Sequence, residues 1–154
     1  MSERKLLLGR KAIVTGGASG IGEAIVMAYA SEGAHVLVVD LPDSNVSKSF
    51  TNIEDVTPLE QDITDEDAPK NIVSAAITAM GGFDILVNNA GISLPDSIEA
   101  EGEDLWEKTM SINVTSMFRI TRAALPELKK SDTGRVINLG SIMSDMGGPN
   151  LFVY

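Results

Sequence analysis

Short apolar runs recur along the chain and alternate with longer mixed segments. Four of these runs are nearly continuous and rich in β-branched residues, at positions 12–14, 36–39, 85–87 and 136–137. Strands buried on both faces of a parallel sheet have this pattern, because helices cover such a sheet from both sides. We therefore predict four strong strands at these positions and a weaker fifth strand near 58–61.

The first two segments between the strands have helical spacing. Apolar residues over 21–28 follow an i, i+3, i+4, i+7 pattern, and Gly33 can end that helix. Thr64 is the predicted N-cap of a second helix, whose apolar residues continue to Met80 before a Gly-Gly stop. The segment 41–56 is the least regular, and we expect a loop there with at most a short helix.

The longest helix is predicted from Glu103 to about Lys130. Pro126 is expected to bend or end it, because proline removes a backbone donor and clashes with the preceding turn. Its apolar face is wide enough to contact both a sheet and a second surface, such as another subunit. Strands that alternate with helices in this way predict an α/β fold with right-handed crossovers and a parallel sheet.

Composition narrows the possible functions. The chain has 154 residues, which suits one domain, and 12 Lys+Arg against 22 Asp+Glu give a net charge of −10. That charge argues against nucleic acid and anionic membranes as partners. With no cysteine and one histidine (His35), we expect neither disulfides nor a multi-His or Cys-ligated metal site. The apolar run at 6–8 is too short for a signal-peptide core, so we expect a cytoplasmic protein.

A glycine-rich turn follows the first predicted strand. It reads Thr-Gly-Gly-Ala-Ser-Gly-Ile-Gly over 15–22, and a helix is predicted to start within it. Glycines at this place permit a tight turn and the close approach of a pyrophosphate, while the helix start offers free N–H groups. No Lys-Ser or Lys-Thr pair follows, which excludes a P-loop. The turn is a candidate phosphate site or, alternatively, a plain connection between two elements.

Asp40 is the second candidate. It ends the second predicted strand, 18 residues after Gly22, close to where a dinucleotide site places an acid that accepts from the ribose 2′-OH. A carboxylate there would repel a 2′-phosphate, and neither Ala18 nor Leu41 supplies a basic group to hold one. The pattern favours NAD over NADP. The alternative is a solvated carboxylate at the end of a strand.

Further motifs follow in a fixed order along the chain. They are Gly16-x-x-x-Gly20-x-Gly22 after Thr15, Asn88-Asn89-Ala90-Gly91 after the third strand, Asn113 in the long helix, Asn138 to Ser141 after the fourth strong strand, and Tyr154. In this order they resemble the short-chain dehydrogenase/reductase family, over nearly the whole chain. The resemblance implies a Rossmann-like doubly wound parallel sheet. The residues 1–154 would form its dinucleotide-binding domain, C-terminally incomplete and with about five strands.

The resemblance also implies a role for each matched residue. Cofactor binding would fall to Gly16, Ser19, Gly20, Ile21 and Gly22 at the pyrophosphate, Asp40 and Leu41 at the adenosine ribose, Asp62 and Ile63 at the adenine, and Asn89, Ala90 and Gly91 along the cleft. Asn88 would brace the sheet. Ser141 would hydrogen-bond the substrate oxygen, Tyr154 would exchange its proton, and Asn113 would position a relay water.

Each of these three catalytic candidates has a plainer interpretation. Ser141 could cap loop backbone, Tyr154 could be an ordinary half-buried tyrosine, and Asn113 could be a hydrogen-bonding residue of its helix. The family pattern also continues as Tyr-x-x-x-Lys, whereas this sequence ends at Tyr154. We therefore expect the chain by itself to be an impaired fragment, with the fourth strong strand as an exposed apolar edge.

Three hypotheses follow from the sequence. The first is an NAD-dependent oxidoreductase that interconverts a small alcohol and a ketone, and whose full-length form is a homo-oligomer. The second is a non-catalytic NAD(H)-binding module. The third is a remnant that neither folds well nor binds a cofactor.

Overall fold

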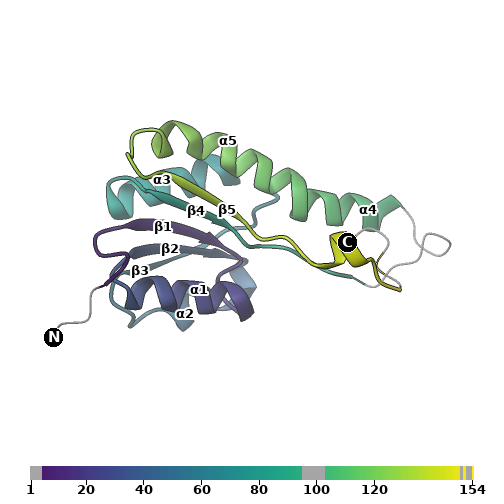
Figure 1. The fold of residues 1–154 in the computed structure, drawn as a ribbon, viewed down its shortest axis with the longest axis horizontal. Coiled ribbons are helices and arrows are strands. Elements are labelled where there is room, and N and C mark those ends of the chain that lie inside the picture. The colour runs from purple at the N-terminus through teal and green to yellow at the C-terminus, as the bar shows by residue number, and fades with distance from the viewer. Residues whose placement is uncertain (1–4, 95–102, 150, 152–153) are drawn as a thin grey trace.

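Five parallel strands form the sheet at the centre of the computed structural model, which describes residues 5–94, 103–149, 151 and 154 (Figure 1). The strands are β1 (Lys11–Thr15), β2 (His35–Asp40), β3 (Val56–Glu60), β4 (Ile85–Asn88) and β5 (Arg135–Asn138). Their order across the sheet is β3-β2-β1-β4-β5, and every neighbouring pair is parallel. The predicted α/β class, the parallel sheet and the number of strands are confirmed.

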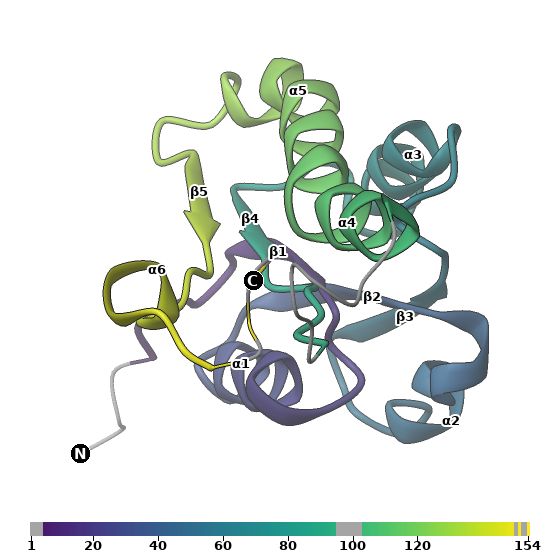
Figure 2. The same ribbon diagram turned by 90° about the vertical axis from the view of Figure 1, so that its right-hand side faces the viewer.

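Helical segments occupy the connections between the strands, and one short helix follows the last strand. They are α1 (Gly20–Ser31), the 3₁₀ turn η1 (Pro42–Ser44), α2 (Val46–Ser49), α3 (Ala68–Met80), α4 (Glu103–Met110), the π-helical turn η2 (Ser111–Thr115), α5 (Ser116–Leu128) and α6 (Met143–Met146). The helices α1 and α2 cover one face of the sheet, and α3, α4 and α5 lie on the other (Figures 1 and 2). None of the helices in the described ranges is both long enough and apolar enough to cross a membrane.

The two faces of the sheet have separate apolar cores, and β1 contributes to both. Ile13 packs into the cluster that includes Ile72 of α3 and Ile120 of α5. Its neighbour Val14 packs into the opposite cluster with Val26 of α1. Successive side chains of a strand point to opposite faces, so a strand covered on both sides needs apolar residues at every position. This explains the continuous runs in the sequence.

Strand β5 is the exception, because it forms one edge of the sheet. All four of its residues are exposed, including Val136 and Ile137. The expectation of an exposed apolar edge is confirmed in this chain.

One detail of the predicted helices is narrowed by the structure and another is wrong: Pro126 does not end its helix, and Thr64 is not an N-cap. Helix α5 continues through Pro126 to Leu128, and the backbone N–H of Lys129 reaches the carbonyl of Leu125, so helical bonding resumes beyond the proline. Thr64 does not cap α3. Its N–H and hydroxyl instead bind the carboxylate of Asp62, and α3 begins only at Ala68.

The sheet order places a crevice at the carboxyl ends of the central strands. From β1 the chain proceeds to β2 and β3 on one side, and then to β4 and β5 on the other. In open α/β sheets, the point where the connections change direction leaves a gap between the loops, and ligands bind there. In this molecule that point lies between β1 and β4.

Candidate functional site

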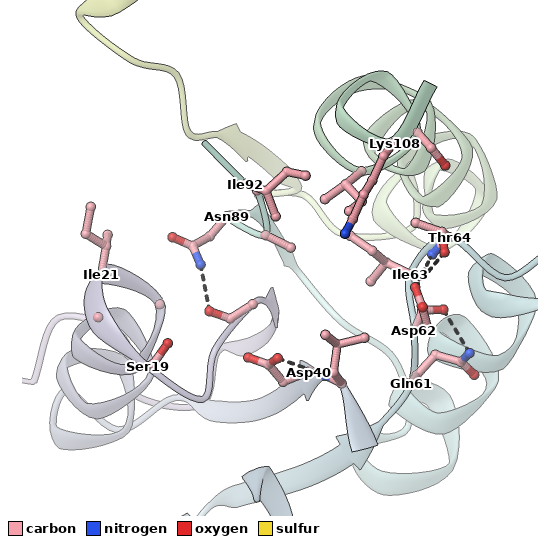
Figure 3. A pocket seen from close by; sticks show the side chains of 18 residues that line it. Ser19, Ile21, Asp40, Gln61, Asp62, Ile63, Thr64, Asn89, Ile92 and Lys108 are labelled. Atoms are coloured by element: carbon pink, nitrogen blue, oxygen red, sulfur yellow. Dashed lines mark hydrogen bonds between the residues drawn. The ribbon is translucent and has the colours of Figure 1, made fainter. Parts of the chain in front are cut away.

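A cavity of about 690 Å³ lies at this crevice, within the usual range for small-molecule sites (Figure 3). The glycine-rich turn, the end of β2, the segment after β3, the segment after β4 and the α4–η2 helix form its walls. Twelve of its lining residues are the proposed cofactor contacts: Gly16, Ser19, Gly20, Ile21, Gly22, Asp40, Leu41, Asp62, Ile63, Asn89, Ala90 and Gly91. The fold thus gathers residues from four separate segments around one space.

The glycine-rich turn needs glycine for two different reasons. Gly16 and Gly20 have φ of +64° and +55°, a left-handed conformation that residues with a Cβ rarely adopt. At Gly22 the reason is space, since a Cβ there would lie 2.0 Å from the carbonyl oxygen of Gly16. No atom of another described part of the chain lies within 4 Å of a Cβ built on Gly20, so the turn is open on that side.

Helix α1 starts at the same turn with its N–H groups available. Ser19 is the N-cap, but its side chain makes no capping hydrogen bond. The first amides of a helix have no acceptor within the helix itself. They therefore give this wall of the cavity backbone donors and the positive end of the helix dipole.

Asp40 joins the glycine-rich turn to the end of β2. Its Oδ2 accepts the N–H of Ala18 at 2.8 Å, and its Oδ1 accepts the N–H of Leu41 at 2.8 Å. A carboxylate has about four acceptor positions, so two backbone bonds leave capacity for a ligand. The side chain is half-buried and lines the cavity.

Thr15 and Asn89 hold the turn to the segment after β4. The Asn89 side-chain amide donates to the carbonyls of Thr15 at 3.0 Å and Gly16 at 2.8 Å. The Thr15 hydroxyl oxygen accepts the N–H groups of Asn89 and Ala90, each at 3.2 Å. Sequence analysis used Thr15 only to mark the motif, whereas the structure shows it building the site.

Asn88 connects the sheet to a helix. Its side-chain amide donates to Thr121 of α5 at 3.0 Å and to Asn138 of β5 at 2.8 Å. This arrangement agrees with the expected bracing of the sheet. His35 lies on β2, where its ring pairs with the hydroxyl of Thr57 on β3, and it does not line the cavity.

The segment after β3 supplies one end of the cavity. Asp62 Oδ1 accepts from both the N–H and the hydroxyl of Thr64, at 2.8 and 2.7 Å, which fixes the loop. Ile63 is buried and gives this end an apolar surface. A flat heterocyclic ring suits such a surface, because an apolar wall stabilises its face while polar groups bind its edge.

Asn113 holds the segment after β4 from the helix side. Its Oδ1 accepts the N–H of Ile92, and its Nδ2 donates to the carbonyl of Ile92, both at 2.9 Å. It lies in the π-helical turn η2, which the sequence pattern did not predict. An amide side chain has four hydrogen-bonding positions, so within the described residues one N–H and one lone pair remain for a water.

Ser141 and Tyr154 lie outside the cavity wall. Ser141 is half-buried, and its hydroxyl oxygen accepts the N–H of Met143 at 3.2 Å, while Tyr154 is 40% exposed. Over the described residues, the cavity lining includes neither of them, nor Asn113. The structure therefore brings the cofactor candidates together in one wall. Asn113 is bonded to Ile92 of that wall and lies beside Gly91 without lining the cavity, and Ser141 and Tyr154 are not part of the wall.

Six further lining residues were not predicted from the sequence: Gln61, Thr64, Ile92, Lys108, Ser111 and Ile112. Three of them come from the long helix and are spaced i, i+3 and i+4, so they share one helix face. That spacing is present in the sequence. A helix face that carries one lysine, one serine and one isoleucine nevertheless gives no sign that it faces a ligand.

Comparison with known proteins gives a consistent family. A model of the short chain dehydrogenase family matches residues 10–154. The chain is 38% identical to a 2,5-dichloro-2,5-cyclohexadiene-1,4-diol dehydrogenase of Sphingobium indicum, over 89% of this chain and 56% of that protein. It is 31% identical to a 3-oxoacyl-(acyl-carrier-protein) reductase of Thermotoga maritima, over 93% and 60%. It is 35% identical to (+)-borneol dehydrogenase 2 of Salvia officinalis, over 92% and 52%. The chain thus spans about half the length of the curated relatives it matches.

Proposed function

The chain belongs to the short-chain dehydrogenase family, and on this premise we propose that the protein is an NAD-dependent oxidoreductase that interconverts an alcohol and a ketone. The observation that carries the proposal is the cavity that has the glycine-rich turn on one wall and Asp40 beside it. The similarity of the chain to proteins named for a diol, a 3-oxoacyl group and borneol supports oxidation and reduction at a carbon–oxygen bond.

The glycine-rich turn fits a pyrophosphate. A Cβ on Gly20 would project into open space at the cavity wall, so glycine leaves room for a ligand to approach the backbone. The first amides of α1 can donate to phosphate oxygens there. This binding mode needs no basic side chain, which agrees with the acidic character of the chain.

Asp40 supports the choice of NAD. Its remaining lone pairs can accept from the two hydroxyl groups of an adenosine ribose, whereas a 2′-phosphate would meet a negative charge at short range. The adjoining Leu41 offers no cation. Beyond the ribose, Asp62 and Ile63 would hold the adenine at its edge and face.

For the chemical step we propose Ser141, Tyr154 and Asn113. When bound, the nicotinamide supplies or accepts a hydride, and charge then changes on the substrate oxygen. Because Ser141 accepts the Met143 N–H, its own O–H is available to donate to that oxygen. Tyr154 would donate or take the proton, and the spare N–H of Asn113 would position a relay water.

A non-catalytic NAD(H)-binding module is the second candidate for this chain. One observation favours it: the cavity lining contains the cofactor candidates but neither Ser141 nor Tyr154 among the described residues. Efficient proton transfer needs a positioned group, whereas binding of NAD(H) alone needs none.

We also propose that the protein forms homo-oligomers. The continuous helical region formed by α4, η2 and α5 carries exposed large apolar side chains at Trp106 of α4, Val114 of η2, and Phe118 and Leu125 of α5. Adjacent exposed apolar groups of this size are typical of a protein interface.

Calorimetric titration of the chain with NADH and NADPH tests the proposal. We expect NADH to bind at least about tenfold more tightly, a difference of about 1.4 kcal/mol, because only NADPH carries the phosphate that Asp40 repels. The substitution Asp40→Asn removes that charge and should reduce the difference between the affinities for NADH and NADPH. Asp43→Asn, an exposed change in η1, is the matched control and should leave both affinities unchanged.

The result separates the candidates. Binding accompanied by alcohol oxidation or ketone reduction supports the oxidoreductase, and binding without turnover supports the binding module. Absence of heat with both cofactors contradicts both, and absence of a cooperative thermal transition would leave only the remnant hypothesis.

A further inference from the structure

Lys108 occupies a place in the cavity to which no motif of the sequence assigns a role. It lies in the last turn of α4, on the same helix face as Ser111 and Ile112, and all three line the cavity. Figure 3 shows its side chain extending from the helix, with the amine toward the space beside Ile63 and Asp62. The outward side of the same helix carries Trp106 instead, which is half exposed to solvent.

Among the described residues that line the cavity, Lys108 is the one with a positively charged side chain. Asp40 and Asp62 contribute two negative charges to the wall, and Lys108 is its single cation, which leaves a sum of −1. A dinucleotide brings two further negative charges on its phosphates. A cation in this wall therefore offsets repulsion that the two carboxylates would otherwise exert on the ligand.

The position of Lys108 fits one end of the ligand. The glycine-rich turn suits the pyrophosphate and Asp40 the ribose, so Asp62 and Ile63 lie where the adenine would extend. The adenine edge presents acceptor nitrogens as well as an amino group. An ammonium only donates and a carboxylate only accepts, so Lys108 and Asp62 together match both kinds of group on that edge.

We propose that Lys108 binds the adenosine end of the dinucleotide, with its ammonium donating to an acceptor of the adenine. This inference rests on the proposed function, since it assigns a further binding residue to the same site. Lys108 is exposed at the cavity mouth, so the contact is partly screened by solvent. Its contribution is therefore to affinity and orientation at the adenine end, away from the reacting carbon.

The test measures dissociation constants of NADH and ADP-ribose for the wild-type chain and for Lys108→Met. ADP-ribose lacks the nicotinamide but shares the adenosine end. We expect the substitution to weaken both ligands by a similar factor, about fivefold to tenfold, which is typical of a partly exposed charged hydrogen bond. Lys108→Arg keeps the charge and the donors and should retain affinity within about twofold.

The matched control is Lys70→Met, which removes an exposed helical lysine of α3 outside the cavity. It should change neither affinity, and equal thermal midpoints for the variants exclude misfolding. Unchanged binding of both ligands by Lys108→Met overturns the inference, as does weakening confined to NADH, which would move the contact to the nicotinamide half. If the wild-type chain binds neither ligand, the proposed function itself fails.

Discussion

Single atoms decide whether the glycine-rich turn can form. The Cα of Gly22 faces the carbonyl of Gly16 so closely that a methyl group would overlap it, and the Asn89 amide lies 2.5 Å from the same point. Asn89 in turn donates to Gly16 and Thr15. Any side chain at Gly22 would therefore disturb the helix start and the bonds that tie it to β4.

Substituting Gly22→Ala should destabilise the chain by about 1–3 kcal/mol, the usual cost of overpacking. NADH affinity should fall by at least about tenfold, because the shifted turn no longer presents the first amides of α1. Urea denaturation and calorimetry measure the two effects.

Gly140→Ala is the matched control, because no atom of the described residues lies within 4 Å of the added Cβ and the φ of Gly140 is not positive. It should change neither the free energy of unfolding nor the affinity for NADH. If Gly22→Ala has the same stability and the same NADH affinity as the wild-type chain, the close contact between Gly22 and Gly16 is not what shapes the turn.

At this scale the sequence predicted which residues gather, but not the hydrogen bonds that hold them in place. The spacing of Gly16, Gly20 and Gly22 and the position of Asp40 were sufficient to select residues that line one cavity. The two backbone bonds of the Asp40 carboxylate were not predictable, since they depend on the exact path of the turn. Lys108 was not predicted, because the sequence does not show that this part of the helix faces the cavity.

At the scale of elements, the long helical region is the informative part. The apolar pattern predicts one helix over 103–130, whereas the structure divides it into α4, the π-helical turn η2 and α5. A π turn adds one residue to a helical turn, which hardly changes an i, i+3, i+4 pattern. Its effect is local, because it sets Asn113 opposite Ile92 and so fixes the segment after β4.

Pro126 shows the opposite case, in which a strong local signal does not end the helix. Its missing N–H removes one bond of α5, but the buried Ala124 and Leu128 on either side pack into the core and keep the helix together. Packing thus keeps the chain helical for two residues beyond the proline, although proline itself disfavours a helix there.

Replacing Pro126→Ala should therefore stabilise the chain, by about 1 kcal/mol, because a backbone donor is restored in the last turn of α5. The midpoint of urea denaturation should rise with no change in slope. Arg119→Ala, an exposed substitution in the same helix, should alter stability by less than about 0.5 kcal/mol. A loss of stability in Pro126→Ala would mean that the proline conformation itself is required there.

At the scale of the whole molecule, the arrangement of strands creates the site. Continuous apolar runs separated by helices were sufficient to predict the parallel sheet, and the observed order β3-β2-β1-β4-β5 places the crevice between β1 and β4. What the pattern could not place are Ser141 and Tyr154, which follow β5 at the exposed edge. Residues beyond an edge strand have few neighbours to fix them, so local sequence alone does not determine where they lie.

The central claim is that the cavity at the carboxyl ends of β1, β2 and β4 binds NADH. Backbone amide NMR shifts of the chain during titration with NADH test it most directly. We predict that the shifted amides cluster at 16–22, 40–41, 61–64, 89–92 and 108–112, the segments that line the cavity. Saturable shifts confined instead to β5 and the α5–β5 connection, or no saturable shifts at all, would contradict the claim.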